Sequence, residues 1–401
     1  MTKKIFIVFV LHLSLACPGF SASLNWQEVE KSAKNTTVTF TMWGGSTSIN
    51  AWVDGYVSEE VKKRFGITLK RRPISDAAEL VNQLLGEKQA GRKSGSTDLA
   101  WVNGENFKIL KKSTALTGPF LFELPNFGSY YDADSSAINM DFGNPVEGFE
   151  APYGRAQFIF IYESQKIKTP PKTLDDLLSM CRKYPGRFTY PAPPDFIGSA
   201  FVRHIVYEKT GGYPQYLGKI DLALLRRNFP KVVTFLKELK SCSWHKGETY
   251  PNSSARLNQL YADGEVWFSM AYSPASAENE IIKGVFPAST RTFVLSSGTL
   301  SNTHFLAIPF NAPNVSGAKV VANFLLSPDA QLSKYKPENW GDFPALSQTK
   351  LSAADKKRFA DVSFGPATLS LAELFQHQVP EIDPEYLVEI EKAWTREVAR
   401  K

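Results

Sequence analysis

Apolar and polar residues change their spacing along the first hundred residues, so that strand-like runs alternate with helix-like ones. The run at 38–43, "VTFTMW", is short and largely apolar, whereas apolar residues at 49–65 recur every three or four positions, which is typical of an amphipathic helix. The pattern then predicts a strand at 67–74, a helix at 77–90 and a strand at 98–102. This β-α-β-α-β order predicts parallel strands joined by right-handed crossovers.

A second alternating series begins near residue 156. Strands are expected at 156–162, 187–192 and 266–272, and helices at 173–184, 199–209, 229–240 and 280–286. The chain has 401 residues, more than one hydrophobic core usually supports. Two α/β lobes are therefore expected, although no Pro/Gly-rich linker separates them.

The N-terminus has the pattern of a secretory signal peptide over residues 1–22. Lys3 and Lys4 precede a short apolar run, and small residues follow it. Cys17 raises the alternative of a lipoprotein, but the three residues before it make a poor lipobox. No later segment is long and apolar enough to cross a membrane, so we expect an exported protein in the periplasm.

The composition excludes several classes of protein. The net charge is +6 and the lysines and arginines are scattered, so no nucleic-acid surface is indicated. With 43% apolar and 21% charged residues, the composition is that of an ordinary globular protein, and we expect a monomer. After removal of the signal peptide, only Cys181 and Cys242 remain, and they could form a disulfide or stay as two buried thiols.

Motifs of common catalytic and metal sites are absent. The sequence contains no Gly-x-x-x-x-Gly-Lys-Ser/Thr loop, no His-Glu-x-x-His, no Cys-x-x-Cys and no Gly-x-Ser-x-Gly. The histidines at 204, 245, 304 and 377 are widely separated and do not have ligand spacing. We therefore expect no enzyme, no cofactor and no metal site, while a triad built from distant residues is recognised by geometry and not by sequence.

Four loops follow predicted strands or precede predicted helices, where open α/β sheets bind ligands. Their candidate residues are Trp43, Gly44, Gly45 and Ser46; Asn103, Gly104, Glu105 and Asn106; Asp195, Gly198 and Ser199; and Tyr272, Ser273 and Glu278. Each set has a purely structural alternative. Trp43 could pack on a tight turn, Ser199 could be an N-cap, and Glu278 could complement a helix dipole.

Three motifs in this order resemble a known family. "FIFIYESQKIKTPPKTLDDLL", "AKVVANFLLSPDAQLSKY" and "ENWGDFPAL" are similar to stretches of the periplasmic solute-binding proteins of ATP-binding-cassette (ABC) importers. Within these, the chain resembles family 1 of the extracellular solute-binding proteins. It is most similar to the YnjB-type group and more distantly to thiamine, polyamine and ferric-iron binders.

The resemblance implies a two-lobed, type II periplasmic-binding-protein fold with the ligand in a cleft between the lobes. Lobe 1 would comprise 23–153 and 300–338, and lobe 2 would comprise 154–299 and 339–401. It also implies that Trp340 contacts the ligand, that inner-membrane ABC permease subunits receive the solute, and that a separate subunit hydrolyses ATP.

The candidate loops combine aromatic, hydroxyl and carboxylate side chains without an arginine. This mixture favours a cationic or heterocyclic solute, such as thiamine or a polyamine. A carbohydrate, an anion held by helix N-termini, or an exported enzyme on the same scaffold are the alternatives. The related ferric-iron binders hold the metal with adjacent tyrosines from the region of lobe 2. Ferric iron is not favoured here, because the only adjacent tyrosines, Tyr130 and Tyr131, lie before the first expected crossover.

Overall fold

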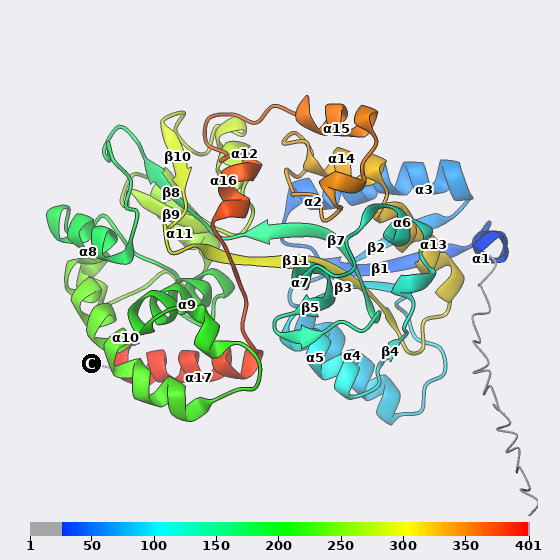
Figure 1. Ribbon diagram of the computed structural model, residues 1–401, viewed down its shortest axis with the longest axis horizontal. Coiled ribbons are helices and arrows are strands. Elements are labelled where there is room, and N and C mark those ends of the chain that lie inside the picture. The colour runs from blue at the N-terminus through cyan, green and yellow to red at the C-terminus, as the bar shows by residue number, and fades with distance from the viewer. Residues whose placement is uncertain (1–25, 400–401) are drawn as a thin grey trace, which may run out of the picture.

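The protein consists of two lobes that lie side by side and are joined by long strands (Figure 1). The computed structural model describes residues 26–399, so the expected signal peptide and Cys17 lie outside the described residues. None of the described helices combines the length and the apolar character that a membrane span requires. The mixed α/β architecture in two lobes confirms the predicted fold class.

The core of lobe 1 is a sheet in which β1 (Thr37–Trp43) pairs in parallel with β2 (Thr68–Ile74) and β3 (Leu99–Val102). β11 (Thr299–Pro309) adds antiparallel to β3. The predicted parallel β-α-β-α-β unit is therefore confirmed. The helices of this lobe are α1 (Trp26–Ala33), α2 (Thr47–Trp52), α3 (Ser58–Phe65), α4 (Ala77–Gln89), α5 (Glu105–Lys112), α6 (Pro125–Tyr130), α7 (Ser136–Asn139), α13 (Val315–Leu325), α14 (Pro328–Tyr335) and α15 (Ala353–Ala360).

Lobe 2 has a smaller sheet in the order β10 (Thr290–Phe293), β8 (Ile159–Glu163), β9 (Phe268–Ala271), with antiparallel pairing. Its helices are α8 (Leu174–Lys183), α9 (Phe196–Thr210), α10 (Leu222–Cys242), α11 (Ser254–Ala262), α12 (Ser276–Ile282), α16 (Leu371–Gln376) and α17 (Pro384–Trp394). The prediction of a strand at 187–192 is wrong. This segment forms no ladder, because Pro191 within it and Pro193 and Pro194 after it cannot donate ladder hydrogen bonds.

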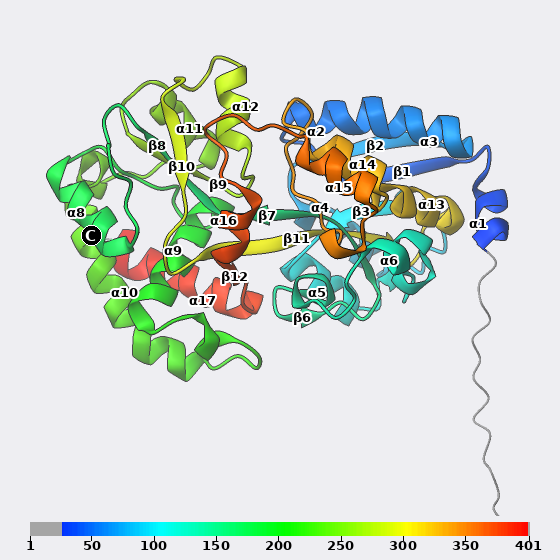
Figure 2. The same ribbon diagram turned by 45° about the horizontal axis from the view of Figure 1, so that its top comes forward.

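Three segments connect the lobes. β7 (Glu150–Gln157) and β11 pair antiparallel across the junction, and residues 361–370 return from α15 to α16 (Figures 1 and 2). The expected boundary at residue 339 needs correction, because Trp340 packs 5.6 Å from Trp101 of β3 and α15 contacts α14. The segment 339–360 therefore lies with lobe 1, which buries these aromatic side chains.

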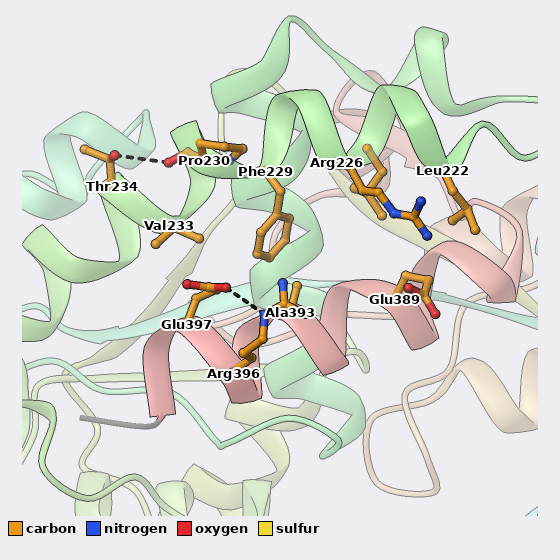
Figure 3. A pocket seen from close by; sticks show the side chains of 11 residues that line it. Leu222, Arg226, Phe229, Pro230, Val233, Thr234, Glu389, Ala393, Arg396 and Glu397 are labelled. Carbon is orange, nitrogen blue, oxygen red and sulfur yellow. Dashed lines mark hydrogen bonds and ion pairs between the residues drawn. The ribbon is translucent and has the colours of Figure 1, made fainter.

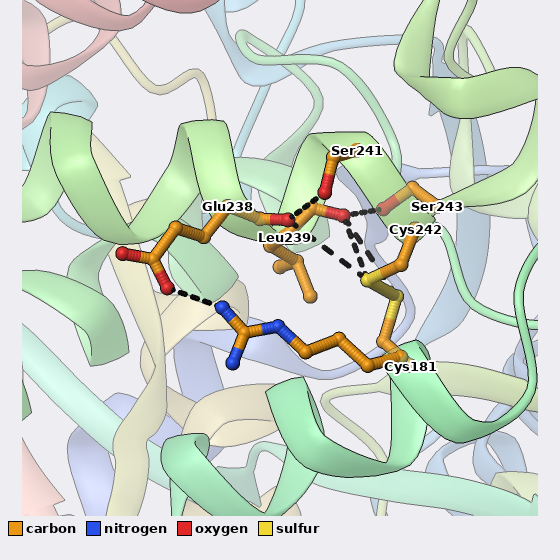
Figure 4. Close-up of a disulfide and its surroundings, with 7 residues drawn as sticks. Cys181, Glu238, Leu239, Ser241, Cys242 and Ser243 are labelled. Carbon is orange, nitrogen blue, oxygen red and sulfur yellow. Dashed lines mark hydrogen bonds and ion pairs between the residues drawn. A yellow bond between two sulfur atoms is a disulfide. The ribbon is translucent and has the colours of Figure 1, made fainter.

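Cys181 and Cys242 form a disulfide that joins α8 to α10 inside lobe 2 (Figure 4). The two cysteines are 61 residues apart in the sequence, and both are buried. Arg182 and Glu238, one helix turn or less from the cysteines, form an ion pair at 2.7 Å between the same two helices. The structure therefore selects the disulfide from the two alternatives that the sequence left open.

Candidate functional site

β1 runs toward lobe 2 (Figure 1), and Trp43 is its last residue. The Trp43 side chain is 43% exposed and lies over Gly45, where an added Cβ would be only 2.2 Å from the indole ring. The Gly44 N–H donates to the carbonyl oxygen of Ile74, and Ser46 caps α2. Glycine at position 45 thus leaves room for the large, partly exposed ring.

The loop after β3 presents three polar side chains without partners. Gly104 adopts φ +63°, a conformation that favours glycine, and its N–H donates to the buried carboxylate of Asp141. Within the part of the chain that the structure describes, the side chains of Asn103, Glu105 and Asn106 form no hydrogen bond or ion pair. They are therefore available to a ligand.

In the third loop, Asp195 and Gly198 are used to build the loop itself. Asp195 caps α9, because its Oδ1 accepts from the N–H groups of Ile197 and Gly198 at 2.9 and 3.0 Å. Its Oδ2 accepts from the N–H of Ser254 at the start of α11. A Cβ on Gly198 would lie 2.0 Å from the carbonyl oxygen of Pro191, so glycine is required there for packing. Asp195 and Gly198 thus build the loop and do not present free groups.

Ser199 contacts Glu391, a residue that the sequence did not indicate. Its Oγ–H donates a short hydrogen bond to the carboxylate of Glu391 on α17. Burial raises the pKa of Glu391 above its ordinary value, and the negative charge of Glu105 adds to this shift, while the Ser199 hydrogen bond and the charge of Arg203 oppose it. Glu105 of lobe 1 and Glu391 of lobe 2 are therefore near enough to repel each other.

Tyr272 is buried at the end of β9, and its phenol donates to Glu381, which pairs with Arg203. The ring of Phe196 packs 4.8 Å from the Tyr272 ring and is itself 47% exposed. Ser273 is half-buried, and its side chain has no partner among the described residues. The exposed aromatic face of this region is thus Phe196, with Tyr272 beneath it.

Glu278 and Trp340 are both buried. Glu278 accepts from the N–H of Ala367 in the third connection between the lobes, so it holds this segment. Trp340 is 4% exposed, and its ring lies against Trp52, Trp101, Tyr153 and His304 and over the ammonium of Lys334. Its carbonyl oxygen accepts from the Asn279 side chain of α12, which ties this loop to lobe 2.

The structure therefore separates the predicted residues into two groups. The residues with available side chains are Trp43, Asn103, Glu105, Asn106 and Ser273. The residues occupied in the fold are Gly44, Gly45, Ser46, Gly104, Asp195, Gly198, Ser199, Tyr272, Glu278 and Trp340. Sequence reasoning missed Glu391, because an acidic residue on an amphipathic helix gives no local signal of what it faces.

A hollow of about 510 Å³ lies elsewhere, between α10 and α17 (Figure 3). Its apolar lining is formed by Leu222, Leu225, Phe229, Val233 and Ala393. None of the predicted site residues lines it, and it involves lobe 2 alone. Size by itself does not identify a ligand site, which also needs convergent polar groups, so we place the candidate site at the predicted loops, where Glu105 of lobe 1 lies near enough to Glu391 of lobe 2 to influence its pKa.

Comparisons with known proteins show which proteins this chain is similar to. Protein YnjB of Escherichia coli (strain K12) is 40% identical over 328 residues, which cover 82% of this chain and 84% of that protein. The spermidine/putrescine ABC transporter substrate-binding protein PotD of Streptococcus pneumoniae has a similar structure, with a TM-score of 0.63 at 14% identity, covering 91% of this chain and 100% of that one. A periplasmic thiamin binding protein gives a TM-score of 0.57 at 17% identity, with 90% and 94% covered.

At these identities the solved structures establish the fold alone. The family assignment comes from the sequence, which matches the bacterial extracellular solute-binding proteins over residues 57–360. Members of this family bind small solutes outside the cytoplasm and work with ABC permease components. The chain therefore belongs to the bacterial extracellular solute-binding protein family, as the solute-binding component of an ABC transporter.

Proposed function

We propose that this protein encloses a small cationic or heterocyclic solute between its lobes in the periplasm and delivers it, as a monomer, to inner-membrane permease subunits. Two of the similar structures are named for spermidine/putrescine and for thiamin, which are of this chemical kind, whereas others are named with fructose-6-phosphate and with iron. The protein itself would carry out no reaction.

The observation that carries the proposal is the approach of Glu105 and Glu391 from opposite lobes. Neither carboxylate forms an ion pair within the described residues, and the pKa of Glu391 is raised mainly by burial, to which the negative charge of Glu105 adds. A positive charge placed between them would remove this repulsion and gain two attractive interactions. An anion placed there would be repelled by both carboxylates.

Exposed aromatic rings supply the second element of recognition. Trp43 of lobe 1 and Phe196 of lobe 2 are the large exposed rings nearest to the candidate loops. Ring faces attract cations and stack on flat heterocycles. Asn103 and Asn106 offer both donors and acceptors for the remaining polar atoms of the solute.

Thermal-shift measurements with spermidine, thiamine, a neutral sugar and a sugar phosphate test the proposal. We expect a rise in melting temperature with a cation, because binding to the folded state alone stabilises it. Glu391→Gln should lose this shift. Glu389→Gln should keep it, because Glu389 lines the hollow on the other side of α17.

Three outcomes would contradict the proposal. A shift produced only by the neutral sugar or only by the sugar phosphate would contradict the positive charge assigned to the solute. Chemical turnover of any solute would indicate an exported enzyme.

Affinity for a cation should also weaken as the pH falls through the raised pKa of Glu391, because protonation removes its charge.

A further inference from the structure

Lys108 makes a polar contact between the lobes that does not run through the connecting strands. Its ammonium lies on α5 and donates to both carboxylate oxygens of Asp383, at 2.9 and 2.8 Å. It also donates to Glu385 Oε1 at 2.9 Å. One side chain of lobe 1 thus binds two acidic residues, Asp383 and Glu385, at the start of α17.

The two ends of this contact belong firmly to different lobes. In lobe 1, Phe107 and Leu110 of α5 are buried in a cluster with Leu84 of α4. In lobe 2, the Tyr386 phenol accepts from the N–H of Asp221 at 2.6 Å, and Trp394 donates to Tyr190 at 3.0 Å. A change in the angle between the lobes would therefore break the Lys108 contacts before it disturbed either helix.

No other ion pair among residues 26–399 joins the lobes. The remaining pairs lie within lobe 1, within lobe 2, or between neighbours on one helix. The Lys108 side chain is 27% exposed and that of Asp383 15% exposed, so the contact is partly shielded but still reached by salt. The pKa of Lys108 is raised, because the hydrogen bonds from its ammonium to Asp383 and Glu385 outweigh the cost of burial.

The Lys108 contact involves the same two helices as the candidate site. Glu105 begins α5 one turn before Lys108, and Glu391 lies on α17 two turns after Asp383. The same two helices therefore carry both the ion pair and the two carboxylates that approach each other.

We propose that Lys108 is an interlobe latch, a positioning residue that sets the equilibrium between open and closed lobes without contacting the solute. This inference rests on the proposed function, because a latch matters only if the lobes open and close. Surface ion pairs of this kind shift an equilibrium by roughly two- to fivefold. The latch would raise solute affinity by the same factor, since affinity scales with the population of the binding-competent form.

Small-angle scattering of the full chain without added solute tests the latch. The wild-type protein should be compact at low salt and should expand at high salt, as screening weakens the ion pair. Lys108→Met should be expanded at both salt concentrations, and Lys108→Arg should restore the compact form. The matched control is Lys111→Met on the same helix, because Lys111 pairs with Glu147 inside lobe 1 and should leave the dimensions unchanged.

Melting temperatures separate opening from unfolding. We expect Lys108→Met to keep the wild-type melting temperature within a few degrees while its radius of gyration rises. If Lys108→Met matches the wild type at both salt concentrations while the wild type expands with salt, the latch is refuted and the proposed function stands. If the wild type keeps its dimensions at every salt concentration and with every solute, the proposed function fails as well.

Discussion

Arg203 and Glu381 form an ion pair in the interior of lobe 2, with Arg203 Nε 3.0 Å from Glu381 Oε2. Their side chains are only 1% and 2% exposed. Arg203 lies on α9, and Glu381 follows β12 (Gln378–Pro380), which pairs with β11 at the junction of the lobes. The pair therefore holds the returning chain against α9, and Tyr272 adds a hydrogen bond to the same carboxylate.

Removal of one partner from this pair should destabilise the protein strongly. We expect Arg203→Met or Glu381→Gln alone to lower the free energy of unfolding by about 3–5 kcal/mol, because Arg203→Met leaves a buried charge without compensation. The double variant should cost less than the sum of the two, since both charges are gone. Urea unfolding of the three variants measures this coupling, and additive costs would show that the two groups do not interact.

Trp43 and Trp340 should respond in opposite ways to replacement by alanine. Trp43 is exposed, so Trp43→Ala should leave the melting temperature without ligand nearly unchanged and should weaken binding of a desolvated cation by about 1–2 kcal/mol. Trp340 is buried among aromatic rings, so Trp340→Ala should cost about 3–5 kcal/mol of stability. Thermal melts with and without spermidine distinguish the two, and a strongly destabilised Trp43→Ala protein would contradict a stacking role.

The fold could be predicted well wherever its signal was local. The parallel strands of lobe 1 and most of the helices follow from spacing within a few residues. The boundary at 339 was wrong because Trp340 is buried by residues far away in the sequence, such as Trp52 and Trp101. Tertiary contacts of this kind leave no trace in the pattern around position 340.

The site was less predictable than the fold, for a related reason. Loops at strand ends can be located from sequence, and Trp43, Asn103 and Glu105 were predicted as site residues on this basis. Whether a side chain in such a loop is free depends on its partners. Asp195 is occupied by three N–H groups, and Glu391 reaches the site from a helix almost 200 residues later.

The disulfide should make a clear contribution to the stability of lobe 2. Replacement of Cys181 and Cys242 by serine should lower the free energy of unfolding by about 4 kcal/mol, as the bridge closes a loop with a sequence separation of 61 residues. Solute binding at the remaining folded fraction should be unchanged, because the bridge joins α8 and α10 on the side of lobe 2 that is turned away from lobe 1 (Figure 1). Chemical denaturation with and without reductant gives the measurement. Equal stability under both conditions would show that the two thiols are not bridged in solution.

Glu150 on β7 should make the stability of the protein depend on pH in an unusual direction. Both of its carboxylate oxygens are buried and have no hydrogen-bond partner among the described residues. Burial raises the pKa of Glu150 well above its ordinary value, the nearby Asp141 adds to this shift, and Lys111 opposes it. The folded protein therefore retains a proton that the unfolded chain releases at lower pH.

Below the unfolded pKa both states hold this proton, so Glu150→Gln should have little effect on stability there. As the pH rises above that value, the wild type should lose about 1.4 kcal/mol per pH unit until the folded pKa is reached. Glu150→Gln removes this loss and should be more stable than the wild type at neutral pH. Thermal melts from acidic to mildly alkaline pH measure the difference, with the exposed Glu59→Gln as the control. A Glu150→Gln protein that is less stable than the wild type at neutral pH would show that the carboxylate is ionised and has a partner.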